Sequence, residues 1–177
     1  AHKLYGPKGV GALIVRRRLR RHLDAQIDGG GHEGHLRSGT LPVPLLVGFG
    51  EACRIARLEL EAESQRIPQL RDRLWDGLNS QLEGLHLNGH LTERLPGNLN
   101  VSLDGDVLMN AMTSIAVSSG SACTSSNPEP SHVLRAIGRD DQLTRASLRF
   151  GIGRFNSAEE IETAIEFVVA TVKRLRG

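Results

Sequence analysis

Two stripes of aliphatic side chains at helical spacing constrain the fold of this chain more than any other feature. The members of each stripe lie three or four residues apart: Leu70, Leu74, Leu78 and Leu82, then Ile161, Ile165, Val168, Val172 and Leu175. Such spacing gives each helix one apolar face, which must pack against another layer. We place the first helix between residues 44 and 82, where Pro68 is predicted to kink or split it.

The ends of two helices are marked by capping residues. Ser157 and Glu160 form a capping box, in which each side chain satisfies the backbone N–H of the other residue. A helix of one to two turns is predicted to begin at Ser131 and to stop at Gly138. Asp106 is predicted to cap another short helix.

Short apolar runs predict strands before and between these helices, at residues 11–17, 85–87, 98–103, 115–117 and 146–150. The chain is therefore α/β. Aromatic residues make up only 3% of the 177 residues, so the core must be aliphatic.

Charge and composition exclude several classes of protein. The net charge is only +2, too small to draw the whole chain to nucleic acid or to a membrane surface. The arginine-rich run at residues 16–21 is interpreted as a solvated loop or helix end. No apolar run approaches the roughly 20 residues that span a bilayer. Two distant cysteines do not form a disulfide framework, which favours a reducing compartment.

One of these cysteines, Cys123, lies in a polar stretch rich in serine, at residues 118–128. Structural cysteines are usually buried. A thiol on a solvated loop suits a nucleophile that must travel, although a loop thiol without an adjacent base is often incidental. Cys53 lies in a helical pattern and is interpreted as a packing residue.

Lys3 stands at the start of a glycine-rich turn. A lysine beside a phosphate site can form a Schiff base with pyridoxal phosphate, and the neighbouring His2 could donate to that phosphate. Spacing alone favours an ordinary surface lysine.

Residues 29–40 are too rich in glycine for regular structure and predict a loop whose backbone can approach a ligand. Thr40 ends this loop and could bond a phosphate or cap the next segment. Its His32-Glu33-Gly34-His35 cluster lacks the helical spacing of a zinc motif. Arg149 is flanked by apolar residues, so it needs a partner, either a substrate carboxylate or an internal acid.

Four segments together resemble the cysteine desulfurases, pyridoxal-phosphate enzymes of the class V aminotransferase group: residues 1–11, 29–40, 118–124 and 148–155. The cysteine loop is similar to that of the housekeeping iron–sulfur-cluster branch. The resemblance implies the C-terminal part of a fold type I transferase. Residues 1–45 would then end the large cofactor-binding domain, and residues 46–177 would form the small α/β domain that carries the cysteine loop.

The resemblance also implies roles for individual residues. Lys3 would hold pyridoxal 5'-phosphate as an imine and later move the substrate Cα proton, while His2 would lie at the phosphate. Thr40 would reach the phosphate of a neighbouring subunit, which implies a homodimer. Arg149 would bind the carboxylate of L-cysteine. Cys123 would take the substrate sulfur as a persulfide and leave alanine.

The partners implied are an iron–sulfur scaffold protein and other sulfur acceptors, with Cys123 as a transient iron–sulfur ligand. A bacterial cytoplasm is the expected location, with the mitochondrial matrix as the alternative. The histidine and aspartate that the family places on the cofactor ring are not among these residues, so we expect the isolated chain to turn over little substrate.

Three alternatives stay open at this point. The first is a non-catalytic chain that keeps only partner binding. The second is another class V enzyme, such as a selenocysteine lyase. The third is a cysteine hydrolase that pairs Cys123 with His132.

Overall fold

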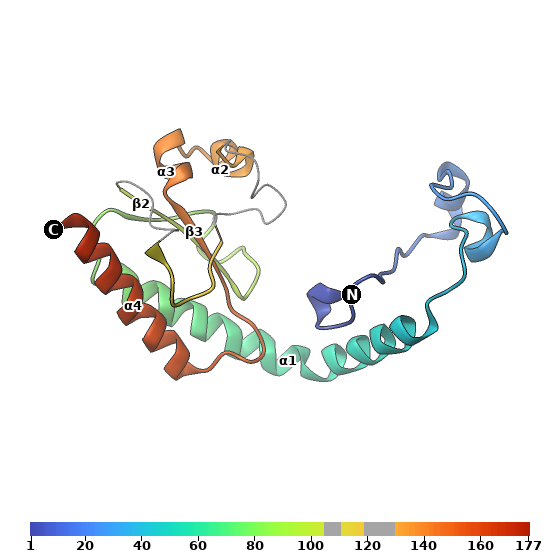
Figure 1. Ribbon diagram of the computed structural model, residues 1–177, viewed down its shortest axis with the longest axis horizontal. Coiled ribbons are helices and arrows are strands. Elements are labelled where there is room, and N and C mark those ends of the chain that lie inside the picture. Colours follow the sequence, from blue (N-terminus) through green and yellow to red (C-terminus); the bar gives the residue numbers. More distant parts are fainter. Residues whose placement is uncertain (105–110, 119–129) are drawn as a thin grey trace. The chain divides into compact units, whose positions relative to one another are not determined.

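The computed structural model describes residues 1–104, 111–118 and 130–177 (Figure 1). The chain divides into two compact units, Ala1–Glu61 and Ala62–Gly177. The division into two domains after residue 45 stays a prediction, because these units reflect packing within this chain alone. No helix in the described part combines the length and apolar character needed to cross a membrane.

The first unit holds three short 3-10 helices, η1 (His2–Leu4), η2 (Arg17–His22) and η3 (His32–His35), and the first part of the long helix α1 (Val43–Asn79). The strand predicted at residues 11–17 is wrong: residues 11–16 are irregular, and Leu13 and Ile14 are 81% and 95% exposed. A strand needs a neighbour for its backbone hydrogen bonds, and none pairs with it in the described residues. The arginine run is solvated in η2, as predicted.

Helix α1 continues through Pro68 for 37 residues, so the proline does not split it. Leu74 and Leu78 in the following turns are 1% and 0% exposed, and this burial stabilises the helix where the proline weakens it. The prediction for Cys53 is wrong, because its side chain is exposed on α1. In the part of α1 that precedes Ile67, Ala52 is the only buried residue. Few side chains in that part of the helix therefore have a packing partner within the described residues.

The second unit contains an antiparallel sheet of three strands in the order β1-β2-β3, with β1 at Leu85–Leu87, β2 at Asn98–Leu103 and β3 at Ser147–Gly151. This unit also contains three further helices, labelled in Figure 1: α2 (His132–Ala136), α3 (Asp141–Arg145) and α4 (Ala158–Arg176). The predicted strands at 85–87 and 98–103 are confirmed, and the one at 146–150 is displaced by one residue.

The core of this unit lies between the sheet and the two long helices. It joins both aliphatic stripes to alternate residues of β2 and β3, including Leu99, Val101, Leu148 and Phe150. Leu175 alone leaves its stripe, with 55% of its surface exposed. The sequence pattern therefore identified the buried face of both helices correctly.

The predicted caps are confirmed where the structure describes them. Ser131 accepts a hydrogen bond from the Leu134 N–H, and Gly138 follows with a left-handed φ of 88°. Ser157 and Glu160 form both bonds of the capping box of α4. The short helix expected after Asp106 begins outside the described residues.

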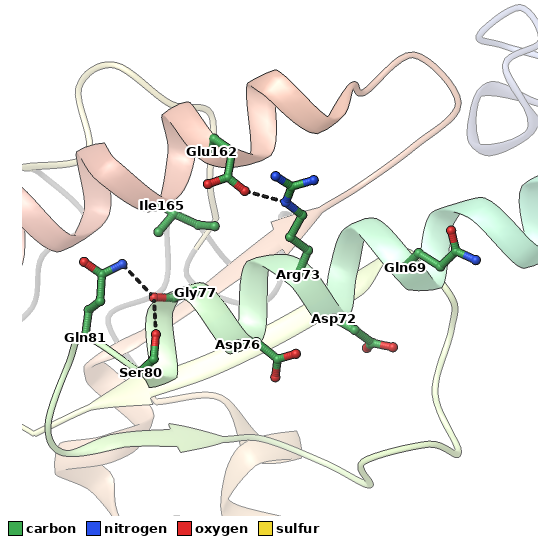
Figure 2. Close-up of a pocket in the computed structure, with 9 residues that line it drawn as sticks. All are labelled: Gln69, Asp72, Arg73, Asp76, Gly77, Ser80, Gln81, Glu162 and Ile165. Atoms are coloured by element: carbon green, nitrogen blue, oxygen red, sulfur yellow. Dashed lines mark hydrogen bonds and ion pairs between the residues drawn. The ribbon is translucent and has the colours of Figure 1, made fainter.

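Helices α1 and α4 approach closely at Gly77, where a Cβ atom would lie 2.4 Å from Ile165 Cδ1. Arg73 reaches across from α1 to form an ion pair with Glu162 of α4 (Figure 2). A groove of about 730 Å³ runs along this contact, and none of the residues predicted to form the site lines it. We attribute the groove to helix packing.

Gly97, just before β2, packs closely against the backbone of Ile152, just after β3. A Cβ atom there would lie 1.9 Å from the Ile152 carbonyl oxygen, and the Gly97 carbonyl accepts the Ile152 N–H at 2.8 Å. Because the obstacle is backbone, we expect Gly97→Ala to lower the free energy of unfolding by about 2–4 kcal/mol. Urea unfolding followed by circular dichroism measures this.

Gly151 is the matched control, since it directly precedes Ile152 and a Cβ atom there would meet nothing within 4 Å. Gly151→Ala should change the stability by no more than about 0.5 kcal/mol. Equal losses in the two variants would contradict the steric argument.

Candidate functional site

Hydrogen bonds join the two ends of the segment that carries Lys3, residues 1–10. The N–H groups of Leu4 and Gly6 both donate to the Ala1 carbonyl, at 2.8 and 3.0 Å, and the Ala1 nitrogen donates to the Val10 carbonyl at 2.6 Å. Lys3 lies in the resulting turn, η1, with its side chain exposed, as is that of His2. The turn therefore presents a primary amine and an imidazole side by side in sequence.

Two glycines seat this turn against α1. A Cβ atom on Gly6 would lie 3.2 Å from the Ala52 Cβ, and one on Gly48 would lie 2.9 Å from the Pro7 Cγ. Both glycines thus permit a close approach that any side chain would widen. For Gly6 the structure thus shows a packing role.

The glycine-rich loop at residues 29–40 is organised around Ser38, which is only 6% exposed. Its hydroxyl accepts the Gly31 N–H at 3.3 Å, and its own N–H donates to the Ile27 carbonyl at 2.9 Å. Sequence reasoning did not single out Ser38, because a serine in a polar loop carries no signal of burial. Thr40 follows Gly39, whose φ is 122°, and is exposed.

Two histidines of the cluster in this loop, His32 and His35, contact other residues of the same loop. His32 Nδ1 accepts the Gly39 N–H at 3.3 Å, and a Cβ atom on Gly31 would lie 2.8 Å from the His35 ring. Within the described ranges, no three side chains among His, Cys, Asp and Glu gather as a metal site would require.

Arg149 lies in the second unit, on β3, and is half-buried. Its backbone forms an isolated bridge with Ser118, in which its N–H donates at 2.6 Å and its carbonyl accepts at 3.2 Å. No acidic side chain in the described residues pairs with its guanidinium. Of the two partners predicted for Arg149, an internal acid is therefore not found in that part of the chain.

Cys123 lies outside the described residues, and the segment leading to it is described as far as Ser118. The strand predicted at residues 115–117 is wrong, because only the Ser118 bridge forms there. His132 begins α2 and is exposed.

A polar network that the sequence did not reveal joins the sheet to the segment after α2. Arg139 donates to Asn88 Oδ1 at 2.7 Å and to the Leu87 carbonyl at 2.6 Å, and Asn88 donates to Ser102 Oγ at 2.8 Å. Arg94 donates to the Asn88 carbonyl at 2.8 Å, and burial lowers the pKa of its guanidinium. These hydrogen bonds hold the segment after α2 against strands β1 and β2, and β2 in turn pairs with β3.

Residues 1–163 match the family model described as aminotransferase class V. This chain belongs to the class V aminotransferase family. It is 55% identical over 179 residues to cysteine desulfurase IscS of Aeromonas hydrophila subsp. hydrophila, covering 99% of this chain and 44% of that protein. The chain thus spans less than half the length of this class V relative.

Solved structures of class V relatives agree. A NifS-like protein superposes with a TM-score of 0.83 at 31% identity, covering 97% of this chain and 44% of that one. SspA in complex with cysteine superposes with a TM-score of 0.62, also at 31% identity, over 88% of this chain and 43% of that one. The α/β fold predicted from the sequence is confirmed.

Enzymes of this family use pyridoxal 5'-phosphate, and the first unit contains donors that suit part of this cofactor. The exposed amine of Lys3 suits its aldehyde, and the His2 imidazole and Thr40 hydroxyl suit its phosphate. These residues account for only part of a binding site, since the histidine and aspartate that the family resemblance implies on the cofactor ring are not among them.

Proposed function

We propose that this chain is part of a cysteine desulfurase that converts L-cysteine to L-alanine and a protein-bound persulfide. The observation that carries the proposal is 55% identity, over 99% of this chain, to a protein named cysteine desulfurase. A neighbour solved in complex with cysteine supports the same substrate. The sequence also supplies the lysine, arginine and cysteine that this chemistry needs, which we assign to Lys3, Arg149 and Cys123.

Three residues would hold the cofactor. Lys3 would attach it through its ε-amine, His2 would donate to its phosphate, and Thr40 would bond the phosphate in a neighbouring subunit. Pyridoxal 5'-phosphate, when bound, supplies an electron sink for the bonds at the substrate Cα. The free Lys3 amine would take and return the substrate Cα proton.

Arg149 and Cys123 would act on the substrate itself. The Arg149 guanidinium binds the carboxylate in a bidentate manner and so orients the substrate. The Cys123 thiolate attacks the substrate sulfur, so that an S–S bond forms and the C–S bond breaks. The electron pair of the broken bond stays on the carbon, and protonation there gives alanine.

The finer assignments follow from this chemistry. We propose a homodimer, because Thr40 would serve the neighbouring site, and a bacterial cytoplasmic location. The persulfide on Cys123 would pass to an iron–sulfur scaffold protein or another sulfur acceptor. On the scaffold protein, Cys123 would briefly serve as a shared ligand of the iron–sulfur cluster.

The test is to incubate the full-length protein with L-cysteine and to quantify alanine and the 32 Da mass increase expected on the protein for one added sulfur. We expect both products in equal initial amounts, and slower reaction with L-selenocysteine at equal concentration. Faster reaction with selenocysteine and no persulfide would favour a selenocysteine lyase. Absence of both products, with scaffold binding retained, would favour a partner-binding chain.

A further inference from the structure

Two polar side chains, those of Asn100 on β2 and Arg149 on β3, lie next to each other on the face of the sheet that turns away from the core. Their neighbours along both strands belong to the core, so the alternation of a strand places these two on the opposite face. Asn100 lies directly opposite Arg149 in the register. The Arg149 backbone bonds Ser118 instead of β2, and side chains come closest in such a pair. Both residues are half-buried.

The orientation of the Asn100 amide is fixed by a chain of hydrogen bonds that begins at Arg139. A guanidinium can only donate, so Asn88 must turn its Oδ1 towards Arg139 Nε, at 2.7 Å. The Asn88 amide nitrogen then donates to Asn100 Oδ1 at 2.7 Å and to Ser102 Oγ at 2.8 Å. Asn88 is only 4% exposed, so turning its amide over would leave buried polar atoms without partners.

The amide nitrogen of Asn100 is therefore the atom left to bind another group. Within the described residues this nitrogen has no hydrogen-bond partner. The neighbouring Arg149 guanidinium also only donates, and it has no acidic partner in that part of the chain. Two adjacent donors, one of them cationic, are complementary to a carboxylate and repel a cation.

We propose that Asn100 binds the carboxylate of the amino acid substrate together with Arg149, and that Arg139 and Asn88 are positioning residues that keep its amide in the donating orientation. The proposal rests on the proposed function, which assigns the substrate carboxylate to Arg149. A carboxylate has lone pairs enough to accept from the amide as well as from the guanidinium. Because the amide is oriented in advance, substrate binding costs no reorientation of this side chain.

Binding of L-alanine, the product of the proposed reaction, tests the Asn100 contact without turnover. Full-length protein loaded with cofactor is titrated with L-alanine and, separately, with ethylamine, which is alanine without its carboxylate. The visible absorbance of the cofactor gives a Kd for each. Asn100→Ala and Asn100→Asp both remove the donor, and the aspartate keeps an acceptor for Asn88. Asn98→Ala is the matched control, since Asn98 lies two residues earlier on the same strand and face.

We expect both Asn100 variants to raise the Kd for L-alanine about tenfold or more, because a hydrogen bond to a charged group contributes that much to affinity. The Kd for ethylamine should not change, and Asn98→Ala should match the wild type. Wild-type affinity for L-alanine in both Asn100 variants, or an equal loss for ethylamine, would overturn the contact. A wild-type protein whose absorbance does not respond to L-alanine would overturn the proposed function and this contact with it.

Asn88→Asp tests the positioning role. An aspartate keeps an acceptor for Arg139 but cannot donate to Asn100, so the Asn100 amide is expected to turn its oxygen towards the substrate. We expect the Kd for L-alanine to rise about tenfold at unchanged cofactor absorbance, although Asn88 does not touch the substrate. Ser102→Ala removes only the other acceptor of the Asn88 amide and should bind L-alanine as the wild type does. Wild-type affinity in Asn88→Asp, or equal losses in the two variants, would overturn the positioning role.

Discussion

Replacing Cys123 by serine in the full-length protein is expected to abolish persulfide formation and to lower alanine production from L-cysteine by about 10³-fold or more. A serine hydroxyl is not ionised near neutral pH and is a poor nucleophile towards sulfur, whereas a thiolate is a good one. Cofactor absorbance should be unchanged, because Cys123 is not proposed to hold the cofactor. Mass spectrometry of the protein and an alanine assay measure the two products.

Cys53 provides the matched control, because it is exposed on α1 and has no role in the proposed site. Cys53→Ser should form persulfide at the wild-type rate. If Cys123→Ser also lost the cofactor absorbance, its role would be structural. If Cys53→Ser lost the persulfide instead, the sulfur acceptor would have been assigned to the wrong thiol.

Replacing Lys3 by alanine is expected to have the complementary effect. Without the ε-amine the cofactor has no covalent attachment and the substrate Cα proton has no base, so desulfuration should fall by at least about 10²–10⁴-fold. The visible absorbance of the bound cofactor should be lost with it. Absorbance spectra and alanine release on the same preparation separate loss of cofactor from loss of proton transfer.

Lys8 is the control for this experiment, since it lies five residues from Lys3 in the same hydrogen-bonded segment, has the same charge and is also exposed. Lys8→Ala should keep the cofactor absorbance and most of the activity. Loss of absorbance in both variants would indicate that the charge of the turn matters, and not the Lys3 amine. Added methylamine that restores part of the activity of Lys3→Ala alone would strengthen the assignment.

Much of the second unit could be predicted from the sequence because its signals are local. The stripe through Leu74 and Leu78, the capping box at Ser157 and the stop at Gly138 each depend on residues within a few positions of one another. Helical period and backbone capping act over that distance, so the chain carries them wherever it folds.

The failures have a common cause. The run at residues 11–17 has a strand composition but no strand beside it in the described residues, and Cys53 lies on a helical stretch with few packing partners there. Residues 115–117 also have the right pattern, yet in the described residues only the following residue, Ser118, pairs with β3. Composition reports what a segment prefers, whereas pairing depends on which other segment is present to receive its hydrogen bonds.

For the candidate site, the sequence by itself determined the chemical groups: an amine at Lys3, a thiol at Cys123 and a guanidinium at Arg149, in an order that identifies a family. Only the tertiary structure decided that Arg149 bridges the segment leading to Cys123, and that Gly97 meets Ile152 with no room for a side chain. Such contacts join residues far apart in the chain. They depend on how sheets and helices pack in three dimensions, which spacing along a sequence does not encode.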